Sequence, residues 1–188
     1  EEFAAFHLLH DRNARLALQE YYRTFAEIAV QHRAGFVFDS LTYRASRDWG
    51  RLLGYSKEGL AEMNAACFEL YREAANAAGL PASRTVISGC IGPKGDAYKL
   101  NQGLTANGAE AYHSEQIATF AQNGADIVTA LTLNSTAEAI GIARAAQAAG
   151  LPSVIAFTLE KDRCLRSGEN LQEAIDTVDA QTSKAPAY

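Results

Sequence analysis

The chain has 188 residues, of which 48% are hydrophobic and 21% charged, and its formal net charge is −5. This composition is that of a folded domain, and the scattered lysines and arginines exclude a basic patch for nucleic acid or anionic lipid. No apolar run approaches the roughly 20 residues that span a bilayer, and no signal peptide heads the sequence. We therefore expect a soluble, cytoplasmic protein without a nucleic-acid or membrane partner.

Four short apolar stretches alternate with long amphipathic ones. They read GFVFDSLT from Gly35, TVISGCIG from Thr85, ADIVTALT from Ala125 and SVIAFTLE from Ser153. This rhythm predicts parallel strands joined by helices, because βαβ units alternate in this way. Right-handed crossovers of this kind build either a doubly wound sheet or a (βα)8 barrel. Both place ligands at the carboxyl ends of the strands.

The intervening segments carry helical periodicity. Apolar residues recur at helical spacing over 11–32, 56–78 and 110–123, which predicts amphipathic helices packed on the sheet. Ser56 is the expected N-cap of the second helix, and Cys67 falls on its apolar stripe as a packing residue.

Two further helix starts have the form cap-x-x-Glu. Ser135 precedes Glu138, and Asn170 precedes Glu173. In a capping box the cap side chain and the glutamate satisfy each other's free backbone N–H groups, so both glutamates are predicted to be structural.

The three cysteines, Cys67, Cys90 and Cys164, have no CxxC spacing. An odd number at these separations predicts free thiols rather than a disulfide framework or a local zinc knuckle.

Polar residues follow each predicted strand and would converge on one mouth. The sharpest local feature is Gly92-Pro93-Lys94-Gly95, where glycines flanking a proline make a tight turn whose backbone can approach a ligand closely. A plain surface turn is the alternative for this segment taken alone.

Several ordered segments resemble the homocysteine S-methyltransferase family over nearly the whole chain. They are DSLTYRAS, SGCIGPKGDAY, YHSEQIATFAQNGADIVTALT, EAIGIARAAQAAGLPSVIAFT and LRSGENLQEAIDTV. The resemblance implies an α/β fold of the (βα)8 TIM-barrel type and transfer of a methyl group from a sulfonium, ammonium or folate donor to the sulfur of homocysteine. It also implies zinc, held by three cysteines, which makes the acceptor a thiolate.

The same resemblance places residues 1–188 as a single partial barrel domain that holds about strands two to five. A complete barrel needs about 250 residues, and the sequence starts without Met, so we expect a fragment whose first strand and zinc-binding half lie elsewhere. None of the cysteines matches a ligand position, so no metal ligand is assigned. A homo-oligomer would be another way to cover the free sheet edges.

One substitution concerns the acceptor. Where the family commonly has Glu-Thr, with the carboxylate holding the amino group of homocysteine, this chain has Leu131-Thr132. Leucine cannot pair with an ammonium, so either Asp39 or Glu160 does so, or the acceptor is a related thiol. Arg44 lies where some members place an aromatic or amide side chain beside the substrate. It either pairs with a carboxylate-bearing ligand or is a solvated loop residue.

The predicted substrate-binding residues are Asp39, Thr42, Tyr43, Arg44, Gly92, Pro93, Gly95, Thr132 and Thr158. A thiol acceptor and a methyl donor are the expected small-molecule partners. No catalytic residue is assigned, because the protein's task in such a transfer is to align sulfur and methyl.

Two alternatives remain open for the function. One is a lysine-dependent barrel aldolase or decarboxylase that uses Lys94 or Lys161 as an amine nucleophile. The other is a non-catalytic half-barrel module for binding or oligomerisation. For His113 we expect a capping or packing role rather than catalysis.

Overall fold

The computed structural model describes residues 3–187, which form one parallel sheet with strand order β1-β2-β3-β4. The strands are β1 (Phe36–Asp39), β2 (Thr85–Ile91), β3 (Ile127–Leu133) and β4 (Ser153–Phe157). The α-helices are α1 (Arg12–Gln31), α2 (Arg47–Leu52), α3 (Lys57–Ala78), α4 (Ala106–Gln122), α5 (Thr136–Ala148) and α6 (Leu171–Thr182). The same residues also contain three 3₁₀ helices, η1 (Ala5–His10), η2 (Leu41–Arg44) and η3 (Ala82–Arg84). The predicted α/β class, with four parallel strands in chain order, is confirmed.

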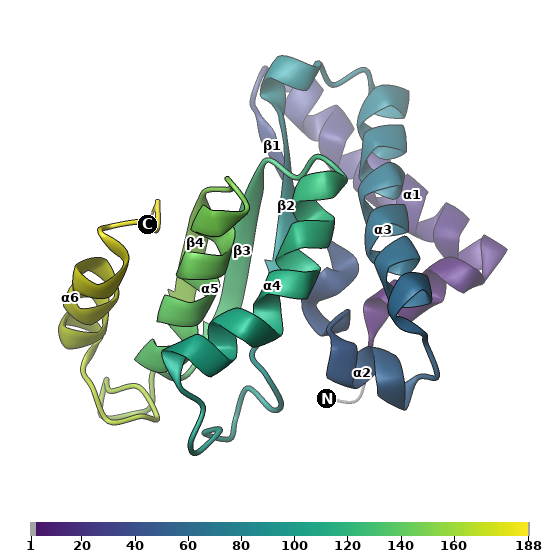
Figure 1. Cartoon of the computed structure of the whole chain (residues 1–188). Helices are drawn as coiled ribbons and strands as arrows, with labels where there is room; N and C mark the ends of the chain where they lie inside the picture. The colour runs from purple at the N-terminus through teal and green to yellow at the C-terminus, as the bar shows by residue number, and fades with distance from the viewer. Residues whose placement is uncertain (1–2, 188) are drawn as a thin grey trace.

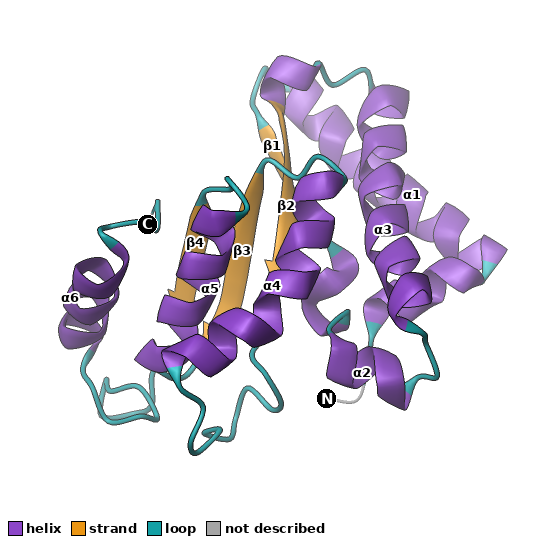
Figure 2. Ribbon diagram, viewed as in Figure 1, coloured by secondary structure: helices purple, strands orange, loops and turns teal. Residues whose placement is uncertain are grey.

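Helices α1, α3, α4 and α5 lie on one face of the sheet, and α6 lies beyond β4 (Figures 1 and 2). Alternate residues of a strand point to opposite faces. Phe38 of β1 and Ile87 of β2 point to the helices and are buried, whereas Val37 on the other face is 50% exposed. The loops that follow the strands gather at the lower edge in Figure 1. None of the helices within residues 3–187 has the length and apolar character needed to cross a membrane.

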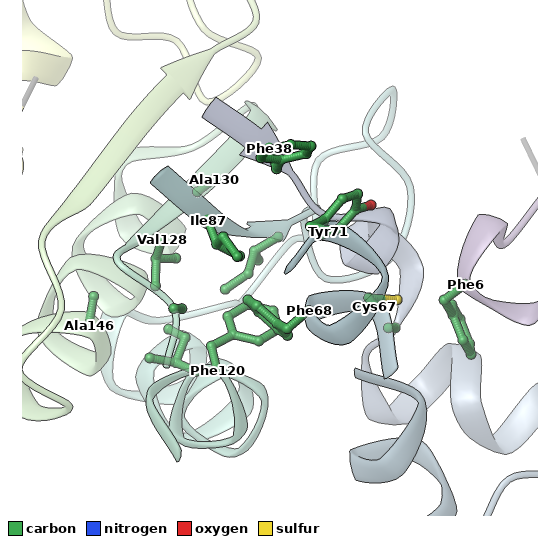
Figure 3. Packing of buried hydrophobic residues seen from close by; sticks show 14 of the residues in the cluster. Phe6, Phe38, Cys67, Phe68, Tyr71, Ile87, Phe120, Val128, Ala130 and Ala146 are labelled. Carbon is green, nitrogen blue, oxygen red and sulfur yellow. The ribbon is translucent and has the colours of Figure 1, made fainter. Parts of the chain in front are cut away.

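The hydrophobic core lies between this face of the sheet and the helices. Figure 3 shows Phe68 and Phe120 beneath Ile87, with Tyr71 beside Phe38. The rings of Phe68 and Phe120 have centroids 5.3 Å apart. Cys67 is fully buried in the same cluster, so its predicted packing role is confirmed.

The helix starts confirm most of the predicted caps. The Ser56 side chain accepts from the backbone N–H of Gly59 at the start of α3, and Asn170 forms a complete capping box with Glu173 at the start of α6. Helix α4 begins at Ala106 rather than at the predicted residue 110, because Thr105 caps it by accepting from Gly108 N.

Two further predictions need correction. Ser135 caps α5 by accepting from the backbone N–H of Glu138, but the Glu138 side chain turns away from the cap, so no reciprocal box forms there. The predicted strand over 35–42 ends at Asp39. Beyond Ser40, whose N–H still bonds to Ser88 O, the chain turns into η2, where the Thr42 hydroxyl donates to Cys90 O.

Candidate substrate site at the carboxyl ends of the strands

The loop after β1 packs directly on the turn after β2. Gly92 N–H donates to the carbonyl oxygen of Tyr43 at 3.0 Å. A Cβ at Gly92 would lie 2.8 Å from two ring carbons of Tyr43 and 2.8 Å from that same oxygen. The sequence predicted that the glycine allows close approach of a ligand. In the structure it is Tyr43 that makes the close approach.

Gly95 serves the same turn for a different reason. Its φ is +91°, and a Cβ there would have no neighbour within 4 Å. A side chain would therefore have room, but the left-handed backbone favours glycine. The turn thus needs Gly92 for space and Gly95 for conformation.

The Tyr43 hydroxyl connects this turn to the end of β3. It lies 2.6 Å from Thr132 Oγ1, which itself donates to Leu131 O at 2.7 Å. Since the threonine proton is used there, Tyr43 donates and Thr132 accepts. Thr132 has a φ of +57°, rare for a β-branched residue, and lies within the register shift between Ala130 and Leu133. Such a residue stores of order 1–3 kcal/mol of strain, which is typical of ligand sites.

Arg44 is 6% exposed, so the alternative of a solvated loop arginine is wrong. Its guanidinium donates to Gly95 O at 2.8 Å and lies 4.5 Å from the Trp49 ring centroid. The packing against Trp49 and the bond to Gly95 join the loop after β1 to the far end of the turn. Pairing with a carboxylate-bearing ligand stays a prediction.

Thr42 is fully buried, and its hydroxyl donates to Cys90 O at 2.8 Å. Ser40 Oγ accepts from Cys90 N at 2.9 Å and also contacts Thr42 Oγ1. Gln116 of α4 donates to Thr42 O at 2.9 Å. These bonds fix the backbone of the loop after β1 at Thr42, and this positions the next two residues, Tyr43 and Arg44.

The structure brings five of the predicted residues into direct contact with one another: Tyr43, Arg44, Gly92, Gly95 and Thr132. Pro93 is buried inside the turn. Asp39 and Thr158 lie at the ends of the outer strands; Asp39 is exposed, and Thr158 N–H donates to Leu133 O at 2.8 Å. The predicted residues therefore share one edge of the sheet, with contacts concentrated between β1, β2 and β3.

Sequence reasoning missed a buried pair behind the turn. Glu138 Oε1 accepts from Lys94 N at 2.5 Å and from His113 Nε2 at 2.9 Å. Both side chains are almost completely buried. His113 lies inside α4 rather than at its start, so it packs and does not cap. The cap-x-x-Glu pattern carried no signal for this contact, because it is equally satisfied by the exposed Glu173.

The two lysines of the aldolase alternative are not buried in an apolar site. Lys94 Nζ lies 5.0 Å from the centroid of the Tyr112 ring, and Lys161 is exposed on the loop after β4. Burial raises the pKa of Tyr112 to about 12, so its hydroxyl stays protonated and donates to Ser46 Oγ at 3.0 Å. No feature of these two lysines favours a Schiff-base function.

Within residues 3–187, no group of three or more His, Cys, Asp or Glu side chains could hold a metal ion. Burial raises the pKa of Cys67 and of Cys90 to about 12, which opposes the thiolate that a metal needs. Cys164 is half-buried on the loop after β4. The cysteines of this chain therefore do not fit a zinc site.

An apolar groove of ≈ 650 Å³ lies apart from these residues, between β4 and α6. Ile155 and Phe157 line it on the strand side, and Leu171 and Ile175 on the helix side. None of the predicted site residues lines it, so it gives no support to the predicted substrate site.

Comparison with known proteins identifies the family. A family model described as homocysteine S-methyltransferase matches residues 1–187. Among curated proteins, a search finds no significant match. Solved structures of the homocysteine methyltransferase MmuM from Escherichia coli do match. Its oxidized form aligns with a TM-score of 0.80 at 19% identity, covering 98% of this chain and 64% of that chain. Its metallated form aligns with a TM-score of 0.77 at 20% identity, covering 98% and 65%.

These alignments show the fold, and they confirm the prediction of a partial (βα)8-type barrel. The chain spans about 64% of the length of the structure that it matches. The match of the family model over residues 1–187 shows more than the fold: this chain belongs to the homocysteine S-methyltransferase family.

Proposed function

We propose that this chain is the substrate-holding part of an S-methyltransferase that moves a methyl group to the sulfur of homocysteine or a related thiol. The observation that carries the proposal is the family match over residues 1–187. The contacts of Tyr43, Gly92 and Thr132 at the carboxyl ends of the strands support it, because this is where parallel α/β sheets bind their ligands.

The part assigned to these residues is orientation. In a methyl transfer the thiolate sulfur must approach the methyl carbon in line with the leaving group. Correct positioning alone lowers the activation free energy by several kcal/mol. The bond of Tyr43 to Thr132 and the bond of Arg44 to Gly95 hold the walls of the site rigid. The hydroxyls of Tyr43 and Thr132 are the polar groups available to orient the acceptor.

Zinc belongs to this proposal only as a group bound outside residues 3–187. Its chemistry would be to deprotonate the acceptor thiol near neutral pH. Since the described side chains offer no ligand set for it, no step of the reaction is assigned to the metal here.

For the amino group of the acceptor we propose Asp39. Of the two carboxylates predicted for this role, Glu160 is paired with Arg166 on the loop after β4. Asp39 is exposed at the end of β1, three residues before Thr42, which leaves its carboxylate accessible to a ligand at this edge of the sheet. A carboxylate there would pair with an ammonium that Leu131 cannot hold.

Isothermal titration of the full-length protein tests this assignment. Homocysteine would be compared with 4-sulfanylbutanoate, which is the same thiol without the amino group. Loss of a charge-assisted hydrogen bond, worth about 1.5–3 kcal/mol, predicts that Asp39→Asn weakens homocysteine binding by roughly 10-fold or more. Binding of 4-sulfanylbutanoate should not change.

Glu160→Gln is the matched control, since it removes the other candidate carboxylate and should leave both affinities as they are. Equal effects of Asp39→Asn on the two thiols would show that Asp39 does not hold the amino group. Failure of the wild-type protein to bind any thiol in its metal-loaded form would contradict the proposed function itself.

A further inference from the structure

The Glu138 side chain is buried, whereas a glutamate that completes a capping box, such as Glu173, stays exposed. Glu138 occupies the same position in its cap-x-x-Glu sequence as Glu173 does at the start of α6. Glu173 stays exposed and accepts from Asn170 N at 3.0 Å, which completes its capping box. The Glu138 side chain is only 2% exposed. Burying a carboxylate costs several kcal/mol unless strong donors compensate.

The two donors that compensate are on different elements. One is the backbone N–H of Lys94, in the turn between Gly92 and Gly95, at 2.5 Å from Glu138 Oε1. The other is His113 Nε2 on α4, at 2.9 Å from the same oxygen. Glu138 therefore links the first turn of α5, the middle of α4 and the turn after β2 through one atom.

The geometry fixes the role of one ring nitrogen of His113. A carboxylate only accepts, so Nε2 donates to Glu138 Oε1. Nδ1 is buried without a hydrogen-bond partner among the described residues. The bond to Glu138 is therefore the hydrogen bond that orients the ring, and it orients the carboxylate as well.

The turn is also held at its first and last residues. Gly92 is held by Tyr43 and Gly95 by Arg44, both from the loop after β1. The bond from Lys94 N to Glu138 ties the backbone at the middle of the turn to the helical layer. Other contacts of Lys94 are that of its Nζ with the Tyr112 ring of α4, 5.0 Å from the centroid, and a long bond of 3.4 Å from Asn101 Nδ2 to its carbonyl oxygen. Without the bond to Glu138, the Lys94 N–H would lose its acceptor on α5.

We propose that Glu138, oriented by His113, is a positioning residue that fixes the backbone of the Gly92–Gly95 turn for the reaction. The inference deepens the proposed function and rests on it in one respect, namely that the turn forms a wall of the substrate site. The anchoring of the turn itself can be measured without any methyl transfer.

The first measurement is hydrogen exchange on the full-length protein. Glu138→Leu keeps the side chain's approximate volume and removes the acceptor. We expect exchange over 93–101 to become at least 10-fold faster, while β2 and β3 keep their protection. Glu138→Gln should fall between this variant and the wild type, since its amide oxygen still accepts. Glu173→Gln, which changes the exposed glutamate of the same motif, is the control and should leave 93–101 unchanged.

The second measurement is a comparison of KM and kcat for the thiol acceptor. A freed turn should raise KM or lower kcat by at least 10-fold in Glu138→Leu, with substantial recovery in Glu138→Gln. If the Glu138–His113 pair served only to join α4 to α5, Glu138→Leu would speed hydrogen exchange over these two helices as much as over 93–101. That result would overturn the inference. Faster exchange at the turn with unchanged KM and kcat would overturn it as well. An inactive wild-type protein would refute the proposed function, and the exchange pattern would still decide the anchoring.

Discussion

Replacing Gly92 by alanine should break the contact between Tyr43 and Thr132. The new Cβ would lie 2.8 Å from two ring carbons and from the carbonyl oxygen of Tyr43. Because the backbone oxygen is involved, rotation of the ring alone cannot relieve the clash, and the loop itself must move. Overpacking of this kind costs about 1–3 kcal/mol of the free energy of unfolding, measurable by urea denaturation. The movement should also pull the Tyr43 hydroxyl away from Thr132 Oγ1, now 2.6 Å distant.

A double-mutant cycle with Tyr43→Phe measures that second effect. In the wild-type background the loss of the hydroxyl should cost about 0.5–1.5 kcal/mol, which is the net value of a hydrogen bond. In the Gly92→Ala background it should cost nothing further. Gly95→Ala is the control, because its φ of +91° makes it destabilising although no atom lies within 4 Å of the new Cβ. Equal costs of Tyr43→Phe in all three backgrounds would refute the reasoning.

Three further predictions concern thiols, alkaline pH and a helix cap. At pH 8 iodoacetamide should modify Cys164 in the native protein and reach Cys67 and Cys90 only after unfolding, which peptide mass spectrometry would show. Burial raises the pKa of these two thiols from 9.0 to about 12. Above pH 9 the unfolded chain therefore loses thiol protons that the native state keeps. The free energy of unfolding should fall as the pH rises from 9 to 12. Stability that stays level over this range in urea titrations would contradict the assignment. Asn170→Ala should lower the free energy of unfolding by about 1 kcal/mol, and no loss would show that the box at α6 contributes nothing.

The strands and long helices could be predicted because their signals are local. Residues 56–78 carry apolar residues at helical spacing after a serine cap, and α3 covers Lys57–Ala78 with that cap. The predicted strand from Thr85 matches β2 in the same way. Each signal lies within the element that it predicts, so tertiary contacts did not overturn it.

The contacts of the site depend on residues far apart in the chain, and this is where sequence reasoning fell short. Glu138 and Glu173 carry the same motif, yet only Glu138 has a buried histidine and a free backbone N–H from another loop within reach. The cap-x-x-Glu pattern itself, which both glutamates satisfy, does not reveal these distant partners.

Arg44 and Gly92 show the same limit. The glycine was expected to let a ligand approach closely, but in the structure Tyr43 packs against it, and this residue, 49 positions earlier in the sequence, could not be identified from the turn. Arg44 packs against Trp49 and bonds to Gly95, and it reaches Gly95 because β1 and β2 are neighbours in the sheet.

The most direct test of the proposed function is methyl transfer by the full-length, metal-loaded protein. Homocysteine would be incubated with a sulfonium, an ammonium and a folate methyl donor in turn, and methionine would be quantified by mass spectrometry. The family match and the site at the carboxyl ends of the strands predict that methionine forms with at least one donor. The same incubations with 4-sulfanylbutanoate test a related thiol as acceptor, and absence of any methylated product from both thiols with all three donors, in protein shown to be folded and metal-loaded, would contradict the proposal.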